Sequence, residues 1–160
     1  MTDDAIVNTA STAWHVIESN KPSSSLVSNT CNAVPAGADP NELTQVQGPN
    51  SVVWRLCFRN HLSVDVIDVR FDLRWEYGAR HRDGGAFISN CYLYVPDCTV
   101  LWGYTVDINV HAYTPSNAGT DTAPVACLPI TVHGTMKSLV DTRELQWDFV
   151  LYGDGRYTVS

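Results

Sequence analysis

Positive charge is scarce in this sequence. Lysine and arginine together number 10 against 17 aspartate and glutamate residues, which gives a formal net charge of −7. Most of the arginines fall in residues 51–82, and the segments on either side are acidic. A protein that condenses on nucleic acid uses a basic arm or face to displace counterions from the phosphates, and this chain has neither. Direct binding to RNA or DNA is therefore not expected.

Long hydrophobic runs are also missing. No stretch approaches the roughly 20 apolar residues of a transmembrane helix. The N-terminal sequence MTDDAIVNTAS carries acidic residues where a signal peptide carries lysine or arginine, and no apolar signal segment follows it. We therefore expect no transmembrane segment. The protein is expected to be cytoplasmic or secreted without a classical signal peptide, unless it is assembled into a virion.

The cysteines do not form a recognisable framework. There are five of them, an odd number, and no CxxC pair occurs, so neither a full set of disulfides nor a zinc knuckle is indicated. Cys91 and Cys98 flank a turn-forming Val95-Pro96-Asp97 sequence and could close a hairpin with a disulfide. The alternative is that the thiols are free and pack as small hydrophobic side chains.

Catalytic and metal-binding motifs are absent as well. The sequence has no GxSxG, HExxH, P-loop, GxGxxG or EF-hand pattern. The histidines are His15, His61, His81, His111 and His133, and none has a partner at i+2 or i+4, the spacing of a compact metal site. We expect a protein that is not an enzyme and holds neither a cofactor nor a metal.

What the sequence does contain is strict alternation of apolar and polar residues. In IDVRFDLRWEY, residues 67–77, every second side chain is apolar and the others are charged, which is the pattern of a strand with one buried face. Comparable patterns or apolar runs, separated by Gly, Pro and Asp turns, occupy residues 52–58, 86–95, 104–113, 125–132, 145–152 and 156–159. Pro129 suggests an edge strand or a bulge. The fold class predicted is all-β, an antiparallel β-sandwich or jelly roll over residues 51–160.

The first 50 residues read differently. Residues 20–50 are rich in Pro, Ser, Asn, Gly and Ala without regular periodicity, which predicts a loop or arm. Residues 5–17 combine helix-like spacing of apolar positions with many β-branched side chains, so both a helix and a strand stay open. We predict an N-terminal arm over residues 1–50 in front of the sandwich.

The polar positions of residues 67–77 are the first candidate interaction surface. Opposite charges alternate along one face of the predicted strand, at Asp68, Arg70, Asp72, Arg74 and Glu76. Exposed ion pairs contribute little stability, about 0.2–1 kcal/mol each. Such a face would keep a long strand soluble and in register, or it would pair with a complementary face on a neighbouring subunit.

Two further segments are candidates for ligand binding. After Tyr77 the alternation breaks into a glycine-rich stretch, residues 75–85, that carries Arg80, His81 and Arg82. It is either a plain hairpin loop or a cationic loop for a phosphate, an acidic glycan or an acidic protein. Aromatic residues surround the turn expected at 96–99 and would serve as cross-strand packing, a glycan platform or a membrane-interface belt; they are Tyr92, Tyr94, Trp102 and Tyr104.

Two stretches resemble the aegerolysin family of small, acidic, lipid-binding β-sandwich proteins without signal peptides. Residues 60–75, NHLSVDVIDVRFDLRW, are similar to that family's first hairpin, and residues 147–160, WDFVLYGDGRYTVS, to its Trp-Asp…Gly…Thr-Val-Ser region. The resemblance implies a β-sandwich that binds lipid, and it assigns no binding residue here. The long N-terminal extension departs from the family pattern.

Two functions are consistent with these features. The first is a non-enzymatic assembly protein, a viral coat or projection subunit held to homo- or hetero-oligomeric neighbours by its N-terminal arm and its charged outer face. It rests on the architectural resemblance of an arm-bearing jelly roll to viral coat modules. The alternative is a soluble lipid- or glycan-binding β-sandwich.

Overall fold

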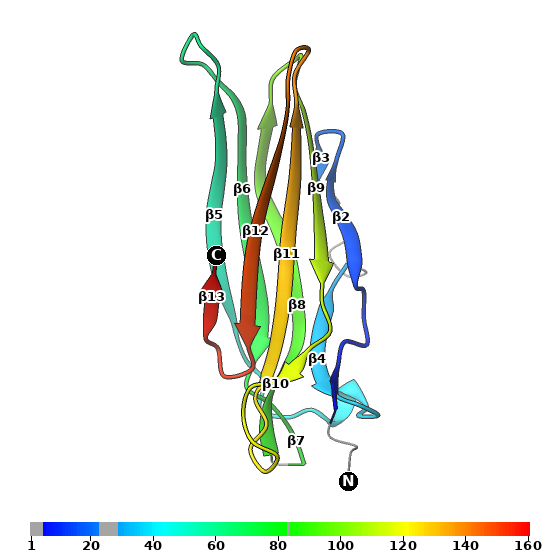
Figure 1. The fold of residues 1–160 in the computed structure, drawn as a ribbon. Helices are drawn as coiled ribbons and strands as arrows, with labels where there is room; N and C mark the ends of the chain where they lie inside the picture. Colours follow the sequence, from blue (N-terminus) through cyan, green and yellow to red (C-terminus); the bar gives the residue numbers. More distant parts are fainter. Residues whose placement is uncertain (1–4, 23–28, 83) are drawn as a thin grey trace.

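The computed structural model describes residues 5–22, 29–82 and 84–160, and these form two antiparallel β-sheets packed face to face (Figure 1). Strands dominate the described residues, and the helical structure found there is the short 3-10 turn η1, Pro40–Glu42. The all-β sandwich predicted from the alternating sequence is therefore confirmed. Its long strands run along one axis, so the molecule is elongated and its hairpin turns gather at its two ends.

The first sheet has the strand order β1-β4-β8-β6-β5, and β7 pairs with β8. Its centre is a pair of long antiparallel ladders that β6 makes with β5 and with β8. The strand bounds are β1 Ile6–Val7, β4 Cys31–Pro35, β5 Gln47–Arg59, β6 Asp65–Tyr77, β7 Ala79–His81 and β8 Gly84–Val100.

The second sheet has the order β13-β12-β11-β9-β2-β3, and β10 pairs with β11. Its centre is β11, which pairs with β12 on one side and with β9 on the other. The strand bounds are β2 Ala13–Glu18, β3 Lys21–Pro22, β9 Thr105–Ala112, β10 Ser116–Asn117, β11 Ala126–Lys137, β12 Thr142–Tyr152 and β13 Tyr157–Val159.

The core lies between the inner faces of the two sheets. Along β6 the apolar positions of the alternating sequence are buried, as predicted; they are Ile67, Val69, Phe71, Leu73 and Trp75. Aromatic rings join the sheets: the Trp54 ring lies 5.0 Å from that of Phe71 and 4.8 Å from that of Phe149 in β12. Because side chains alternate between the faces of a strand, burying these residues turns the polar positions outward.

The prediction that residues 20–50 form a loop or arm is wrong for part of that range. Residues 31–35 form β4, which lies inside the first sheet between β1 and β8, and its apolar side chains belong to the core. Residues 13–18 form β2 of the second sheet, which settles the choice between helix and strand in favour of a strand. The five-residue length of β4 explains why periodicity did not reveal it.

Two proline-based expectations are also corrected. Pro96 does not form a turn, because β8 continues from Gly84 to Val100 and absorbs Pro96 at a bulge between the pairs Arg70–Asp97 and Asp72–Tyr94. Pro129 lies in β11, which is a central strand rather than an edge. The ladder between β11 and β9 begins only at Ile130, so Pro129 occupies a position where its missing N–H costs no ladder bond.

The cysteines are free, and their arrangement excludes the hairpin disulfide considered above. Cys91 and Cys98 both lie in β8, about 23 Å apart at the usual rise of a strand. Cys91 instead lies directly opposite Cys31 in the ladder between β4 and β8, and both thiols are fully buried.

Candidate interaction surfaces

The charged positions of β6 are largely neutralised within their own sheet. Arg55 of β5 donates two hydrogen bonds of 2.7 Å to the two carboxylate oxygens of Asp68. This guanidinium lowers the pKa of the Asp68 carboxyl below its ordinary value, while the carboxylate raises the pKa of Arg55. Both groups are partly exposed, so water screens the pair and its net contribution is small.

The remaining charges of this face also find partners. Arg74 forms an ion pair of 2.7 Å with Asp72, two positions earlier on the same strand. Arg70 lies 3.9 Å from Asp97 of β8, and Glu76 accepts a hydrogen bond from a serine of β8. These contacts fit a face that fixes the register of β5, β6 and β8. Its use as a subunit interface stays a prediction.

The second candidate, residues 75–85, is mostly ordered rather than an open loop. Ala79–His81 form β7, and Arg80 makes a backbone bridge with Thr44. His81 lies 3.1 Å from the Glu42 carboxylate. Together with Arg82 it lines a cavity of about 500 Å³ at the end of the molecule near β7. The same cavity contains the carboxylates of Glu42 and Asp121, so the cationic loop predicted for an acidic partner faces acidic groups of its own chain.

The aromatic candidates do not form a single platform. Tyr92 and Tyr94 lie half-buried on the outer face of β8, where the Arg74 guanidinium lies 5.3 Å from the Tyr94 ring centre. Trp102 and Tyr104 lie far from them, at the turn between β8 and β9. The Tyr104 ring packs against Phe58 at 6.5 Å, whereas the Trp102 side chain is 92% exposed.

Trp102 belongs to an apolar end of the molecule that three hairpin turns form together. The turns are residues 60–64, 101–104 and 138–141, which join β5 to β6, β8 to β9 and β11 to β12. They lie at the same end because Ile67 pairs with Val100 and Thr105 pairs with Lys137, and Figure 1 shows them together at the top. Exposed hydrophobic side chains occupy all three turns; they are Leu62, Val64, Leu101, Trp102, Leu139 and Val140. We call these six residues the apolar end.

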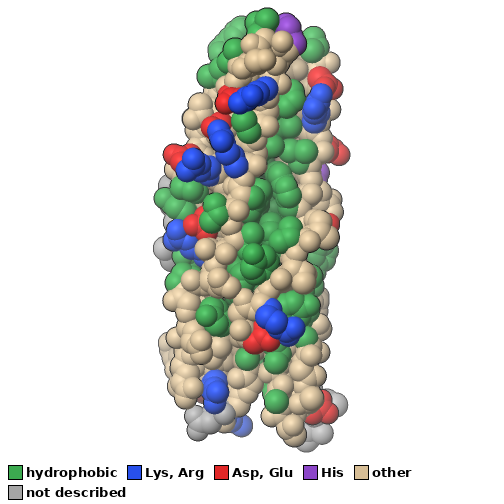
Figure 2. Space-filling model, turned by 90° about the vertical axis from the view of Figure 1, so that its left-hand side faces the viewer, with side chains coloured by type: hydrophobic (Ala, Val, Ile, Leu, Met, Phe, Trp, Pro, Cys, Tyr) green, Lys and Arg blue, Asp and Glu red, His purple; other side chains and the backbone are tan. Residues whose placement is uncertain are grey.

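Basic side chains lie directly behind the apolar end. Arg59 forms an ion pair with Asp65 at 2.6 Å. The Arg143 guanidinium lies 4.9 Å from the ring centre of Phe58 and is held by Asp141. Lys137 is exposed and has no ion pair among the described residues. Figure 2 shows hydrophobic side chains and a histidine at this end, with basic and acidic side chains below them.

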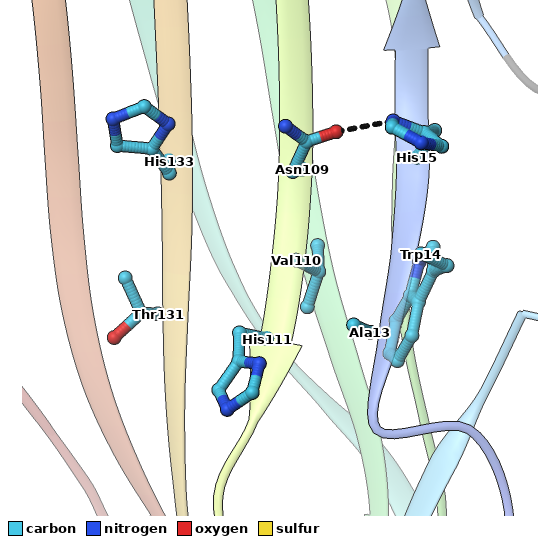
Figure 3. A pocket seen from close by; sticks show the side chains of 8 residues that line it. All are labelled: Ala13, Trp14, His15, Asn109, Val110, His111, Thr131 and His133. Carbon is cyan, nitrogen blue, oxygen red and sulfur yellow. Dashed lines mark hydrogen bonds between the residues drawn. The ribbon is translucent and has the colours of Figure 1, made fainter.

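A third surface lies on the outer face of the second sheet and brings together histidines that are far apart in sequence. His15, Asn109 and His133 form one row across β2, β9 and β11, and His111 and Thr131 form part of the next row. They line a hollow of about 360 Å³, whose other lining residues are Ala13, Trp14 and Val110 (Figure 3). The described residues contain no group of His, Cys, Asp or Glu side chains arranged to hold a metal ion.

Sequence reasoning found only part of these surfaces. It named Trp102 but missed Leu62, Leu139 and Val140, although an apolar pair between turn-forming Ser138 and Asp141 is an unusual sequence for a hairpin tip. It missed the hollow because strands from three parts of the chain supply the lining, and only the strand order shows that they are neighbours.

No protein-family model, curated protein or solved structure matches this chain. Within residues 5–22, 29–82 and 84–160, no helix is long and apolar enough to cross a membrane.

Proposed function

We propose that this protein is a non-enzymatic module that docks reversibly on lipid bilayers through its apolar end. The observation that carries the proposal is the exposure of large hydrophobic side chains on all three turns at one end of the sandwich. Val140 is 94% exposed, Trp102 92% and Leu139 86%. Soluble proteins expose single hydrophobic residues often, but several large ones gathered at one end of a molecule indicate an interaction site.

The shape of the apolar end supports a bilayer as the partner. Its side chains project from hairpin turns, and the hollow described between those turns, beside Phe58, Tyr104 and Ser138, holds only about 20 Å³. A protein interface concentrates its binding energy in packed pockets, whereas a fluid lipid surface accepts protruding apolar groups without a matching pocket. Tryptophan is enriched where the acyl chains meet the headgroups because its ring is apolar and its N–H is polar.

The charges behind the apolar end agree with this orientation. When the turns lie among the upper acyl chains, Arg59, Lys137 and Arg143 lie at the depth of the lipid phosphates, together with Asp65 and Asp141, the partners of the two arginines. The rest of the chain is acidic, since the net charge of the whole is −7. Lys137 is the one of these three basic residues without an ion pair among the described residues, and an anionic membrane would repel the acidic body, so we expect binding to zwitterionic bilayers that changes little with salt.

The expected affinity is modest. Full burial of a large apolar side chain is worth about 1.5–3 kcal/mol. Six side chains that enter the interface only partly therefore give binding comparable with a single acyl anchor, which is reversible. We expect a peripheral protein that exchanges between membrane and water.

Co-sedimentation with phosphatidylcholine vesicles tests the proposal. Trp102→Ser and Leu139→Ser should each weaken binding about fivefold, because each removes about 1 kcal/mol from the burial of a side chain that enters the interface only partly. Val53→Ser is the matched control, since Val53 is 65% exposed but lies along β5 away from the turns. Absence of binding, or an equal loss in the Val53 variant, would refute the proposal.

A second candidate function is assembly into an oligomer such as a viral coat or projection. The observation in its favour is β5, a 13-residue strand at the edge of the first sheet with a free side among the described residues. Unpaired edges can extend a sheet into a neighbouring subunit. Light scattering at micromolar concentration tests this: the assembly function requires a large oligomer, and a monomer would refute it.

A further inference from the structure

In the hollow on the outer face of the second sheet, hydrogen bonds within the protein determine which groups remain as donors or acceptors for a ligand. His15 and Asn109 are neighbours on β2 and β9, and the His15 Nδ1 lies 2.5 Å from the Asn109 side-chain oxygen. Because an amide oxygen only accepts, Nδ1 carries the proton and donates it. In a neutral His15 ring Nε2 is then an acceptor, and the Asn109 amide nitrogen is a donor on the side of His133 (Figure 3).

The hydroxyl of Thr131 is engaged within the protein, and the imidazoles supply the other hydrogen-bonding groups of the hollow. This hydroxyl donates a hydrogen bond of 2.7 Å to the Asp148 carboxylate on β12. The same oxygen lies 3.4 Å from the Tyr113 hydroxyl. The rings of His111 and His133 have no hydrogen-bond partner among the described residues, and a neutral imidazole offers one donor and one acceptor. The hollow therefore presents donors and acceptors side by side.

The lining excludes strong charge. No carboxylate, ammonium or guanidinium group lines the hollow. The carboxylate of Asp148, beside Thr131, is bonded to Thr131 and to Gln146. An ionic ligand would lose hydration without gaining a counter-ion, so the chemistry favours a neutral ligand.

We propose that this hollow binds a neutral polyhydroxylated ligand, namely a hexopyranose unit of a glycan. Each sugar hydroxyl both donates and accepts, which matches the Asn109 donor, the His15 acceptor and the imidazoles of His111 and His133. The hollow's volume of about 360 Å³ lies in the range of small-ligand sites. Beside it the His111 and Tyr113 rings, with centres 4.3 Å apart, offer an aromatic edge for the C–H face of a sugar. This site is separate from the apolar end, so the inference does not depend on lipid docking.

Saturation-transfer NMR with the methyl glycosides of glucose, galactose, mannose and N-acetylglucosamine, each at millimolar concentration, tests the inference. We expect at least one sugar to bind and to shift the ring proton signals of His15 and His133. Asn109→Ala and His133→Ala should weaken binding about tenfold, the usual effect of losing one good hydrogen bond. Thr135→Val is the matched control, because Thr135 lies on the same face of β11 and outside the hollow.

The outcomes distinguish the proposals. Binding that is lost in the Asn109 and His133 variants, retained in Thr135→Val and unchanged in Trp102→Ser supports a glycan site apart from the apolar end. Vesicles with and without a neutral glycolipid separate a membrane source of the sugar from a free polysaccharide. If none of the four sugars binds to protein whose circular dichroism is that of a β-sandwich, or if the Thr135 variant loses binding equally, the glycan site is refuted. Lipid docking is unaffected by that result.

Discussion

Oxidation of Cys31 and Cys91 should join them by a disulfide between β4 and β8. The two residues are direct partners in an antiparallel ladder, where Cα atoms lie about 4.5–5.5 Å apart. This spacing falls within the range that a disulfide spans, about 4.4–6.8 Å. Both thiols are fully buried and contact each other, so the bond requires little movement of the backbone.

The stabilisation follows from the loop that the bond closes. The cross-link would enclose about 60 residues, and the loss of chain entropy in the unfolded state is then worth about 4 kcal/mol at 25 °C. For a domain of this size, each kcal/mol raises the midpoint of thermal unfolding by about 2–4 °C. We expect the oxidised protein to unfold roughly 10 °C above the reduced protein.

The rate of oxidation should depend on whether the protein is folded. Burial raises the pKa of the Cys91 thiol well above its ordinary value, and the neighbouring Cys31 raises it further. Because the thiolate is the attacking species, oxidation of the folded protein should be slow. Refolding with oxidised glutathione should form the bond readily, as the two thiols lose two protons and two electrons to the glutathione disulfide, which is released as two thiols.

Mass spectrometry and thermal unfolding with and without reductant provide the assay. The refolded protein should be lighter by two hydrogens, and peptide mapping should link the Cys31 and Cys91 peptides. Cys31→Ala should abolish the effect of reductant on the unfolding midpoint, whereas Cys98→Ala should leave it intact. The reasoning fails if the midpoint is the same in both redox states of the wild type, or if Cys98→Ala is the variant that abolishes the difference.

Two further predictions concern stability. Gly153→Ala should lower the free energy of unfolding by about 3 kcal/mol or more, as measured by urea titration, because the new Cβ would lie only 2.0 Å from the backbone oxygen of Ala86. Gly84→Ala is the matched control, because the nearest atom to its new Cβ lies at 3.7 Å. Similar losses of stability in the two variants would contradict the prediction. Arg55 lowers the pKa of Asp68, so the pair stabilises the fold above the unfolded-state pKa of about 3.9 and ceases to do so as pH falls through the lower folded-state value. Asp68→Asn should therefore reduce the loss of stability between pH 5 and pH 2, and an unchanged acid profile would exclude this contribution.

Strand content was predictable wherever alternation was long. The side-chain period of a strand is two, so a sequence such as residues 67–77 specifies both the strand and the face that it buries. Short strands were not predicted. β4, for example, has five residues, too few to show a clear periodicity. The two predictions that rested on proline were wrong: Pro96 lies inside a strand, and Pro129 lies in a central strand. A proline is tolerated in a strand where its nitrogen does not face a hydrogen-bonding partner on a neighbouring strand, and only the strand order shows where that is.

The candidate sites divide in the same way. The exposed Trp102 was recognisable as an aromatic residue near a turn, but its association with Leu139 and Val140 depends on three hairpins ending at one level. The charged positions of β6 were recognisable as a set, yet Arg55 and Asp97, which neutralise two of them, come from β5 and β8. Lipid docking, glycan binding and assembly remain proposals that the experiments above decide.

The sequence by itself determined that this protein is an all-β sandwich, because local alternation of apolar and polar residues dictates which face of each strand leaves water. The tertiary structure alone decided which strands are neighbours. That choice gathers His15, Asn109 and His133 into one row, places Cys31 opposite Cys91, and brings three apolar turns to a common end. The strand order follows from the packing of two sheets around one core. That packing joins residues far apart in the chain, so a local sequence pattern does not predict it.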